Sequence, residues 1–259
     1  MRTATDRTRF EPTDGSWSDY AAHEGLRSVL DPRDEEGIKN AYIDAMHKTA
    51  LRHAGLPQAH EVVLDYGCGT GRLTRYLAPR SRAVVGTDIT SAMLRGALRE
   101  GGAPNTVFSH IDGVRLPLRD ASVDLVVSVY VLQYFVAERD AYGAVLQEFA
   151  RVLKPGGRCI FIEQVSYSGT SSGSVAEGAG PHDYLDGDAP VRFRVLQQGA
   201  VRLARPGALV RNTLLRRGFP RFLRRPVQRA VLRRNLQRRL EDLRHQPYVD
   251  WMFHLKRKD

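Results

Sequence analysis

Cysteine is scarce in this chain, and its scarcity excludes several classes of protein. Cys68 and Cys159 are the only two cysteines among 259 residues, so a disulfide framework is not expected. A reducing, cytoplasmic location follows from the same observation. Because no pair of histidines stands near either cysteine, the sequence predicts no structural zinc site and no other metal centre.

Long apolar runs are also missing from the early part of the chain. No segment there has the roughly 18 continuous apolar residues of a membrane helix, and none has the basic-then-apolar pattern of a signal peptide. We therefore expect no transmembrane segment. The first sixteen residues are polar, which favours a disordered tail.

An excess of acidic residues is absent, and the basic excess is confined to one part of the chain. Residues 1–160 contain 20 Lys and Arg against 20 Asp and Glu, whereas residues 161–259 contain 19 against 9, which accounts for the net charge of +10. This asymmetry has two readings. One is a solubilising arginine-rich surface; the other is a partner that is anionic, such as a charged acceptor, a membrane surface or a nucleic acid.

Short apolar runs alternate with helical patterns across the middle of the chain. Strands separated by helices, each strand continuously apolar, predict a parallel sheet covered on both faces. The predicted strands are 61–66, 83–88, 106–110, 123–132 and 158–165, and the predicted helices are 71–78, 91–100 and 138–153, the last of these stopped by "KPGG" at 154–157.

The flanking regions have a different character. An amphipathic helix is expected at 37–56, a Gly- and Ser-rich flexible loop at 166–181, and a helix at 207–219. A strongly basic helix should begin at Pro226 and run to 244, before a closing strand at 248–258. We therefore divide the chain into a tail and lid helices (1–60), a cofactor-binding core (61–165), and an acceptor and cap region of the same domain (166–259).

The stretch "VLDYGCGTGRLT" (63–74) places Gly67, Gly69 and Gly71 between a strand and a helix. Such a turn lets a ligand lie against bare backbone at a helix N-terminus. A dinucleotide site would have the spacing G-x-G-x-x-G, but Arg72 stands where its third glycine belongs. Asp65 at the strand end is a poor neighbour for a pyrophosphate and a good one for an ammonium group.

Two further acidic residues stand at the ends of the next predicted strands. Asp88 can accept hydrogen bonds from both hydroxyls of a ribose, and Asp112 can accept one from an adenine amine. Together with Asp65 they match amine, ribose and adenine in order along an open sheet. Each acid alone is more often a helix cap or a solvated loop residue, so their joint placement carries the argument.

These residues resemble a known family. The segments "VLDYGCGTGRLT", "GTDIT", "DGVRLPLRDASVDLVV" and "LKPGG" are similar to class I S-adenosylmethionine-dependent methyltransferases, especially the small-molecule group with ubiquinone- and sterol-type enzymes. The resemblance covers about residues 61–165. It implies an α/β, Rossmann-like, seven-stranded, mostly parallel sheet of order 3-2-1-4-5-7-6. It also implies that "LLRRGF" (214–219) ends the helix before strand six, and that the basic helix is inserted between the last two strands.

The resemblance also implies which residues bind S-adenosylmethionine. Asp65 and the glycine turn would meet its methionine end, Asp88 its ribose, and Ile89 the face of its adenine. The complete set of expected cofactor contacts is Asp65, Gly67, Cys68, Gly69, Gly71, Asp88, Ile89, Asp112, Gly113, Ser128 and Val129.

No fixed catalytic motif is visible, as expected for a displacement that depends mainly on orientation. His23 and His182 are candidate bases, and Tyr134 is a third candidate catalytic residue, each with an ordinary structural role as its alternative. The expected acceptor contacts are Trp17, Tyr20, Gln133, Tyr134 and Tyr184.

We predict a methyltransferase acting on O or N of a small or medium-sized organic acceptor, in a biosynthetic tailoring step. The acceptor would be anionic or carrier-bound if the basic region contacts it. An alternative is RNA or protein methylation, with the basic helix as a clamp. A third reading is a cofactor-binding protein without transfer activity at a membrane surface.

Overall fold

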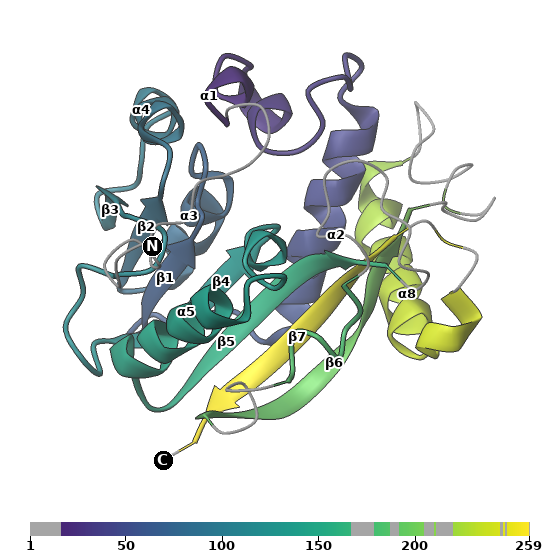
Figure 1. The fold of residues 1–259 in the computed structure, drawn as a ribbon. Coiled ribbons are helices and arrows are strands. Elements are labelled where there is room, and N and C mark those ends of the chain that lie inside the picture. Colours follow the sequence, from purple (N-terminus) through teal and green to yellow (C-terminus); the bar gives the residue numbers. More distant parts are fainter. Residues whose placement is uncertain are drawn as a thin grey trace, which may run out of the picture.

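The computed structural model describes residues 17–166, 179–186, 192–204, 210, 220–243, 246 and 248–258. They form one seven-stranded sheet of order β3-β2-β1-β4-β5-β7-β6, which confirms the predicted topology (Figure 1). The strands β1 to β5 pair in parallel, and β7 is antiparallel to both β5 and β6. The strands are β1 (Val62–Tyr66), β2 (Ala83–Asp88), β3 (Thr106–His110), β4 (Val123–Val129), β5 (Leu153–Val165), β6 (Phe193–Leu203) and β7 (Val249–Arg257).

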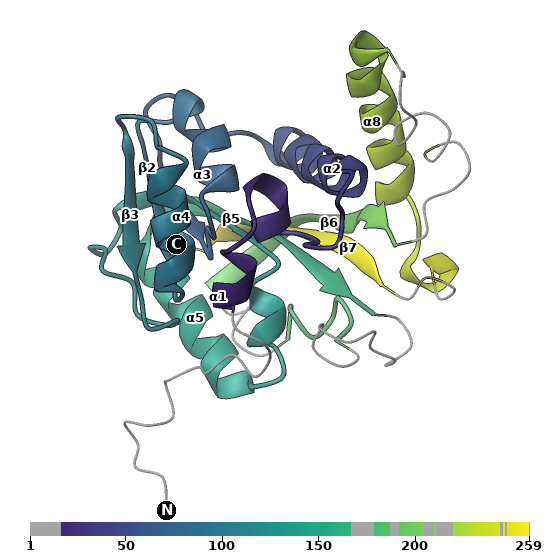
Figure 2. The same ribbon diagram turned by 90° about the horizontal axis from the view of Figure 1, so that it is seen from above.

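Helices cover both faces of this sheet. Figure 2 shows α2, α3 and α8 on one face and α5 on the other. The α-helices are α1 (Trp17–Tyr20), α2 (Ile38–Ala54), α3 (Arg72–Leu77), α4 (Ser91–Arg99), α5 (Arg139–Val152) and α8 (Arg221–Leu236). Short 3-10 helices are η2 (Gly25–Ser28), η3 (Ala78–Arg80), η4 (Leu132–Tyr134) and η5 (Leu240–Leu243). Within the described ranges no helix is long and apolar enough to cross a membrane.

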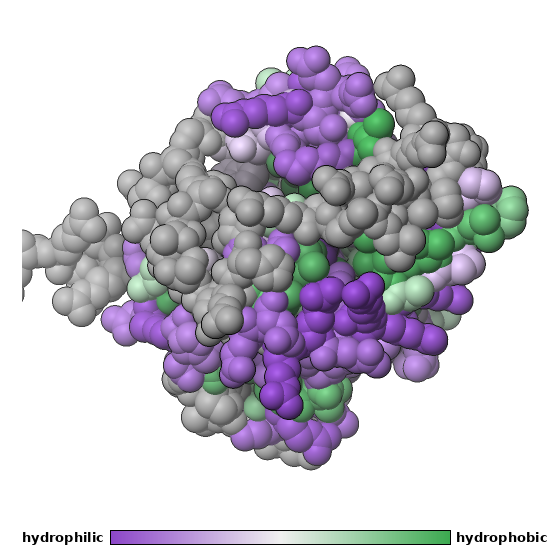
Figure 3. Space-filling view, turned by 90° about the vertical axis from the view of Figure 1, so that its right-hand side faces the viewer, coloured by the Kyte–Doolittle hydropathy of each residue, from purple (hydrophilic) through white to green (hydrophobic). Residues whose placement is uncertain are grey.

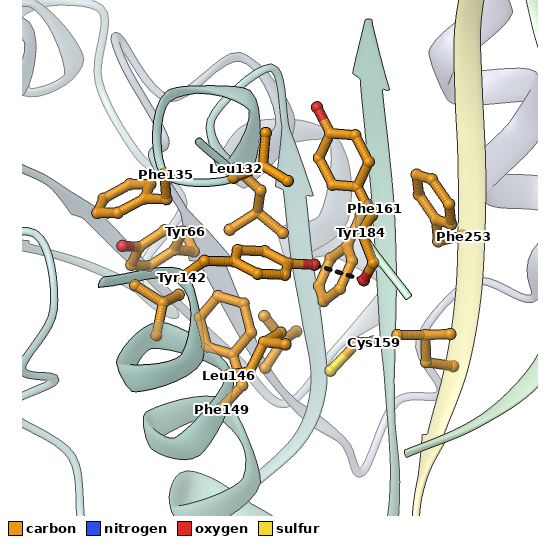
Figure 4. Close-up of a cluster of buried hydrophobic side chains, with 14 of the residues drawn as sticks. Tyr66, Leu132, Phe135, Tyr142, Leu146, Phe149, Cys159, Phe161, Tyr184 and Phe253 are labelled. Carbon is orange, nitrogen blue, oxygen red and sulfur yellow. Dashed lines mark hydrogen bonds between the residues drawn. The ribbon is translucent and has the colours of Figure 1, made fainter. Parts of the chain in front are cut away.

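The two-residue period of the strands divides the core into two layers. In β4, Val126 points toward α5, whereas Leu125 and Val127 point toward α2 and α3. On the α5 side Phe149 is fully buried, with its ring centroid 4.9 Å from that of Tyr66 and 5.8 Å from that of Phe161 (Figure 4). Both faces are therefore apolar, as the continuous hydrophobic runs predict.

Several expectations for the second half of the chain need correction. The strand expected at 158–165 begins earlier, because β5 starts at Leu153 and includes "KPGG", although α5 does end just before this segment, at Val152, as predicted. Strand six is Phe193–Leu203, so it precedes "LLRRGF", which lies outside the described residues. The basic helix begins at Arg221 and ends at Leu236; Pro226 lies inside it, near the exposed N-terminal end. Its place between β6 and β7 agrees with the predicted insertion.

Some other expectations fall partly outside the described residues. The expected helix at 207–219 and most of the expected loop at 166–181 belong to this group. The amphipathic helix expected at 37–56 is α2, and the closing strand expected at 248–258 is β7.

The buried aromatic layer yields a test of this packing. Replacing Phe149 with Ala should lower the free energy of unfolding by about 3–5 kcal/mol, because the cavity left by the ring cannot fully collapse. Urea denaturation followed by circular dichroism would measure it. Leu98 on α4 is 66% exposed, and its replacement by Ala should change stability by less than about 0.5 kcal/mol. Equal effects of the two substitutions would contradict the assignment of the core.

Candidate functional site

A cavity of about 730 Å³ opens where the carboxyl ends of the parallel strands meet. Its volume lies within the roughly 300–1,000 Å³ typical of small-molecule sites. The segments that line it are the turn after β1, residues 88–93 from the end of β2 into α4, Ile111 after β3, residues 129–135 at the end of β4 and after it, parts of residues 17–43, the ends of β5 and β6, and Tyr248 just before β7. This position follows from the topology, because open α/β sheets bind ligands at that edge.

The glycine turn forms one wall of the cavity. Gly67 and Gly69 both line it, with φ of 72° and 54°, a region that side chains disfavour. A Cβ at Gly67 would lie 2.2 Å from Cγ2 of Val131, and one at Gly69 would lie 2.6 Å from Cγ1 of Val29. These glycines are therefore required by protein neighbours as well as by any ligand.

Backbone hydrogen bonds fasten this turn to the end of β2. The Thr87 carbonyl accepts from the N–H groups of Gly67 and Cys68, at 2.8 and 2.9 Å. The Asp88 carboxylate accepts from the N–H of Gly69 through Oδ2 and from that of Thr90 through Oδ1, both at 2.8 Å. Burial raises the pKa of Asp88, which lines the cavity. Each of its oxygens keeps a second lone pair, so it can still accept a diol.

Asp65 lies beneath the turn and does not line the cavity surface. It is buried, and Oδ2 accepts a hydrogen bond of 2.6 Å from the Thr74 hydroxyl. Burial raises its pKa to about 6, although the Thr74 hydroxyl and the Arg72 charge act in the opposite direction. A nearby cation would therefore favour release of its proton near neutral pH.

The expected adenine contacts divide into two groups. Ile89 lines the cavity, together with Ile111 and Met93, which were not predicted from the sequence. Asp112 is exposed and its Oδ1 accepts from the backbone N–H groups of Val114 and Arg115, so it closes the loop after β3. Its expected contact with an adenine amine stays a prediction.

The remaining expected cofactor residues support the turn or the strand tips. Val129 lines the cavity. Cys68, Gly71, Gly113 and Ser128 lie behind its surface; Gly113 accepts a hydrogen bond from the Tyr66 hydroxyl through its carbonyl. Burial raises the pKa of the Cys68 thiol, so it stays protonated and unreactive at neutral pH.

Aromatic side chains form the opposite wall. Trp17 and Tyr20 of α1 and Tyr134 of η4 line the cavity, and the Trp17 and Tyr134 rings meet edge to face at 5.7 Å. Gln133 also lines it and accepts a hydrogen bond of 3.3 Å from the backbone N–H of Gln164. The structure thus brings four of the five expected acceptor residues together.

The other candidates lie elsewhere. Tyr184 is buried in the aromatic core beside Phe253, with its carbonyl accepting from the Tyr142 hydroxyl (Figure 4). His182 is exposed on the surface next to Asp183, and His23 does not line the cavity. Among the residues that the structure describes, no histidine faces this space.

Glu163, at the end of β5, has a supporting role. It is fully buried, and its carboxyl oxygens accept from the backbone N–H groups of Val131, Leu132 and Gln133, at 3.1 to 3.3 Å. Burial raises its pKa to about 8. The contact holds the start of η4 against β5 and so positions Gln133 and Tyr134.

A buried ionic cluster at the β6–β7 end was not predicted from the sequence. Asp250 accepts from Arg202 Nε at 2.5 Å and Nη2 at 2.9 Å, from the Tyr130 hydroxyl at 2.7 Å and from His47 Nε2 at 3.2 Å. Burial alone would raise the pKa of Asp250, but Arg202 and His47 outweigh it and hold it at about 2. Tyr130 and Arg202 line the cavity.

The cluster also determines the charge and the tautomer of the His47 ring. Burial lowers its pKa, so the ring is neutral at pH 7. Since Asp250 can only accept, the proton sits on Nε2, and Nδ1 accepts from Arg72 at 3.5 Å. A charged residue within an otherwise apolar strand, as in "YVDWMF", is the signal that demands a buried partner.

The cavity fits the cofactor that the resemblance implies. Bare backbone at Gly67 and Gly69, a buried carboxylate with spare lone pairs at Asp88, and apolar side chains at Ile89 and Ile111 match the parts of an adenosine. The same cavity is also lined by Trp17, Tyr20, Gln133 and Tyr134, which these adenosine contacts do not use.

Comparisons with known proteins agree with this geometry. Residues 64–161 match the family model described as a methyltransferase domain. The chain is 36% identical over 121 residues to a demethylmenaquinone methyltransferase of Clavibacter sepedonicus, covering 46% of this chain and 48% of that protein. It is 31% identical over 153 residues to a malonyl-[acyl-carrier protein] O-methyltransferase of Pectobacterium atrosepticum, covering 58% and 56%.

A solved structure shares the fold. Phosphoethanolamine N-methyltransferase 1 of Haemonchus contortus, in complex with phosphoethanolamine and S-adenosylhomocysteine, aligns with a TM-score of 0.62 at 17% identity, covering 93% of this chain and 47% of that one. The chain spans about half the length of the curated relatives it matches. From the strand order, the glycine turn and these matches, the chain contains a class I S-adenosylmethionine-dependent methyltransferase domain.

Proposed function

We propose that this protein transfers a methyl group from S-adenosylmethionine to an O or N atom of a small or medium-sized organic acceptor, in a biosynthetic tailoring step. The observation that carries the proposal is one cavity with two unlike ends. The end at Gly67, Gly69 and Asp88 suits the cofactor, and the end lined by Trp17 and Tyr134 suits an organic acceptor.

When bound, S-adenosylmethionine supplies a methyl group on a sulfonium, which is a good leaving group for an in-line displacement. The task of this chain is then to bind, orient and exclude water. Asp88 would hold the ribose through its free lone pairs. Asp65, buried behind the glycine turn, would favour the ammonium group through its charge rather than by lining the cavity. The aromatic wall covers the acceptor and keeps water from the reacting atoms.

The acceptor must lose its proton if it is a hydroxyl. Among the described residues the cavity offers no histidine for this, and burial raises the pKa of Tyr130, which keeps that phenol protonated. His23 and His182 stay predictions as bases. An acceptor that is already ionised, or an amine, would need no base from these walls.

The macromolecular alternative has one observation in its favour. Among the residues of α8, Arg225, Arg229 and Arg233 are exposed and no residue is acidic. Figure 3 shows the side of the molecule that carries α8 in Figure 1; among its described residues, hydrophilic side chains predominate, with hydrophobic ones between them. The exposed apolar residues of β6 and α8 are Val195, Leu196, Phe222 and Leu223.

A labelled-methyl experiment distinguishes these functions. The protein is incubated with methyl-labelled S-adenosylmethionine and a native cell extract, and small organics, lipids, RNA and protein are separated before counting. We expect label in the small-organic fraction, because the cavity rather than α8 contains the acceptor site. Asp88→Ala should reduce transfer about 100-fold through loss of the ribose hydrogen bonds.

The matched control is Asp120→Ala, since the Asp120 side chain is 78% exposed and does not line the cavity. It should transfer at the wild-type rate. If label is found only in RNA or protein, the small-molecule proposal is wrong and the macromolecular alternative holds. If Asp88→Ala transfers methyl groups as fast as wild type, the assignment of the cofactor site is wrong.

Cofactor binding should depend on pH through Asp65. Its pKa is about 6 in the unliganded protein, so below that pH a proton competes with the ligand's ammonium group for the carboxylate. Affinity for S-adenosylhomocysteine should therefore be about tenfold weaker at pH 5 than at pH 7, by calorimetry. Asp65→Asn should bind more weakly at pH 7 and lose most of this dependence. If Asp65→Asn keeps the full wild-type pH dependence, the charge of Asp65 does not act on the ammonium group.

A further inference from the structure

Arg202 is a buried cation that nevertheless faces the cavity. Arg202 is only 3% exposed, and it lines the cavity with Tyr130 and Tyr248. The register of β6 against β7 shifts between Ala200 and Arg202, which marks a bulge at that point. Bulges turn a side chain out of its regular direction and are common beside active sites. The bulge thus gives Arg202 its place at the end of the cavity.

The cluster presents a donor to a ligand at the cavity, since Asp250, whose Oδ1 accepts only one hydrogen bond, is fully buried and does not line the cavity. Arg202 Nε and Nη2 donate to Asp250, and Nη2 also approaches the Tyr130 hydroxyl at 3.4 Å. Nη1 has no hydrogen-bond partner in the described part of the chain. Asp250 Oδ2 already accepts three hydrogen bonds, and the Tyr130 hydroxyl both donates and accepts. The group that remains for a ligand is the Nη1 edge of the Arg202 guanidinium.

The charged side chains that line the cavity also favour an anionic ligand. Arg33, Lys39 and Arg202 line it, against Asp31 and Asp88 as the lining acids. Lys39 is paired with Asp31 at 2.5 Å, and Asp88 already accepts two backbone N–H groups. A guanidinium with free N–H groups is the side chain best matched to a carboxylate or phosphate.

The strand order separates this end from the cofactor end. The glycine turn and Asp88 follow β1 and β2, whereas Arg202 lies on β6 and its partner Asp250 on β7. Tyr130, directly after β4, lies between them and has φ of 64°, an uncommon conformation for a residue with a side chain. That conformation lets its hydroxyl reach Asp250. A strained residue of this kind is typical of a functional site.

We infer that the acceptor carries an anionic group, a carboxylate or a phosphate, which binds to the Nη1 edge of Arg202 while its methyl-accepting atom lies near the tip of β4. The inference rests on the proposed function. Arg202 is then a specificity-determining residue, and the paired Asp250 orients its guanidinium without itself contacting the ligand.

The test uses the full chain loaded with S-adenosylhomocysteine and three aromatic probes of similar size: benzoate, phenyl phosphate and neutral benzamide. Calorimetry should show that at least one of the two anions binds about tenfold more tightly than benzamide. The tighter anion names the class, carboxylate or phosphate. Arg202→Lys should keep part of this preference, since it retains the charge and loses the planar edge.

Because Arg202→Gln alone would leave Asp250 buried and uncompensated, the main variant is Arg202→Gln with Asp250→Asn. It should bind S-adenosylhomocysteine within twofold of wild type and lose the preference for the anion. Arg194→Gln, at an exposed position of the same strand, is the control and should retain it.

Two results would overturn the inference: equal or undetectable binding of all three probes by the loaded wild-type protein, or an undiminished preference in the double variant. Failure of wild-type protein to bind S-adenosylhomocysteine would instead count against the proposed function. The probes are then titrated into the unliganded protein, where loss of the anion preference in the double variant still decides the role of Arg202.

Discussion

The cavity depends on the attachment of the glycine turn to the end of β2. Three consecutive backbone N–H groups, from Gly67 to Gly69, donate to the Thr87 carbonyl and the Asp88 carboxylate. These bonds hold a turn that has no side chains of its own to anchor it at Gly67 and Gly69. They also orient Asp88, so the residue expected to bind ribose is the one that orders the turn. A ligand at this place meets a wall that is already formed, which lowers the entropic cost of binding.

At the other end, Asp250 joins four elements that are distant in sequence. Its carboxylate contacts His47 of α2, Tyr130 after β4 and Arg202 of β6, and it lies on β7. Buried ion pairs often contribute little to stability, because the cost of removing both ions from water offsets their attraction. Such a cluster is easier to explain by the position it gives to Arg202 and Tyr130 than by stability. The two ends of the cavity are thus alike: at each, a buried carboxylate, Asp88 or Asp250, orders its neighbours, and hydrogen-bonding groups remain for a ligand.

The core of the sheet could be predicted because its local signals agree. β1, β2 and β4 are apolar runs followed by helical patterns, and Gly67, Gly69, Asp65 and Asp88 stand at strand ends where the topology brings them together. β6 could not, since Arg194, Val195 and Leu196 are exposed at the sheet edge and two register shifts break the alternation. The sequence predicts Pro226 as a helix start, because proline favours the first turn, yet it is the sixth residue of α8, where it leaves the Phe222 carbonyl without its intrahelical donor. The Arg202–Asp250 pair depends on the register of β6 against β7, which no local pattern specifies. Tyr184 illustrates the same limit, because its place in the core is set by β7 rather than by its own loop.

The most direct test of the account is a crystal structure of the protein with S-adenosylhomocysteine. The account predicts the ribose hydroxyls on Asp88, the adenine against Ile89, and the sulfur beside Val129, facing the space between Tyr134 and Arg202. A ligand bound elsewhere, or one whose sulfur faces away from Tyr130 and Arg202, would contradict the assignment of a cofactor end and an acceptor end to one cavity.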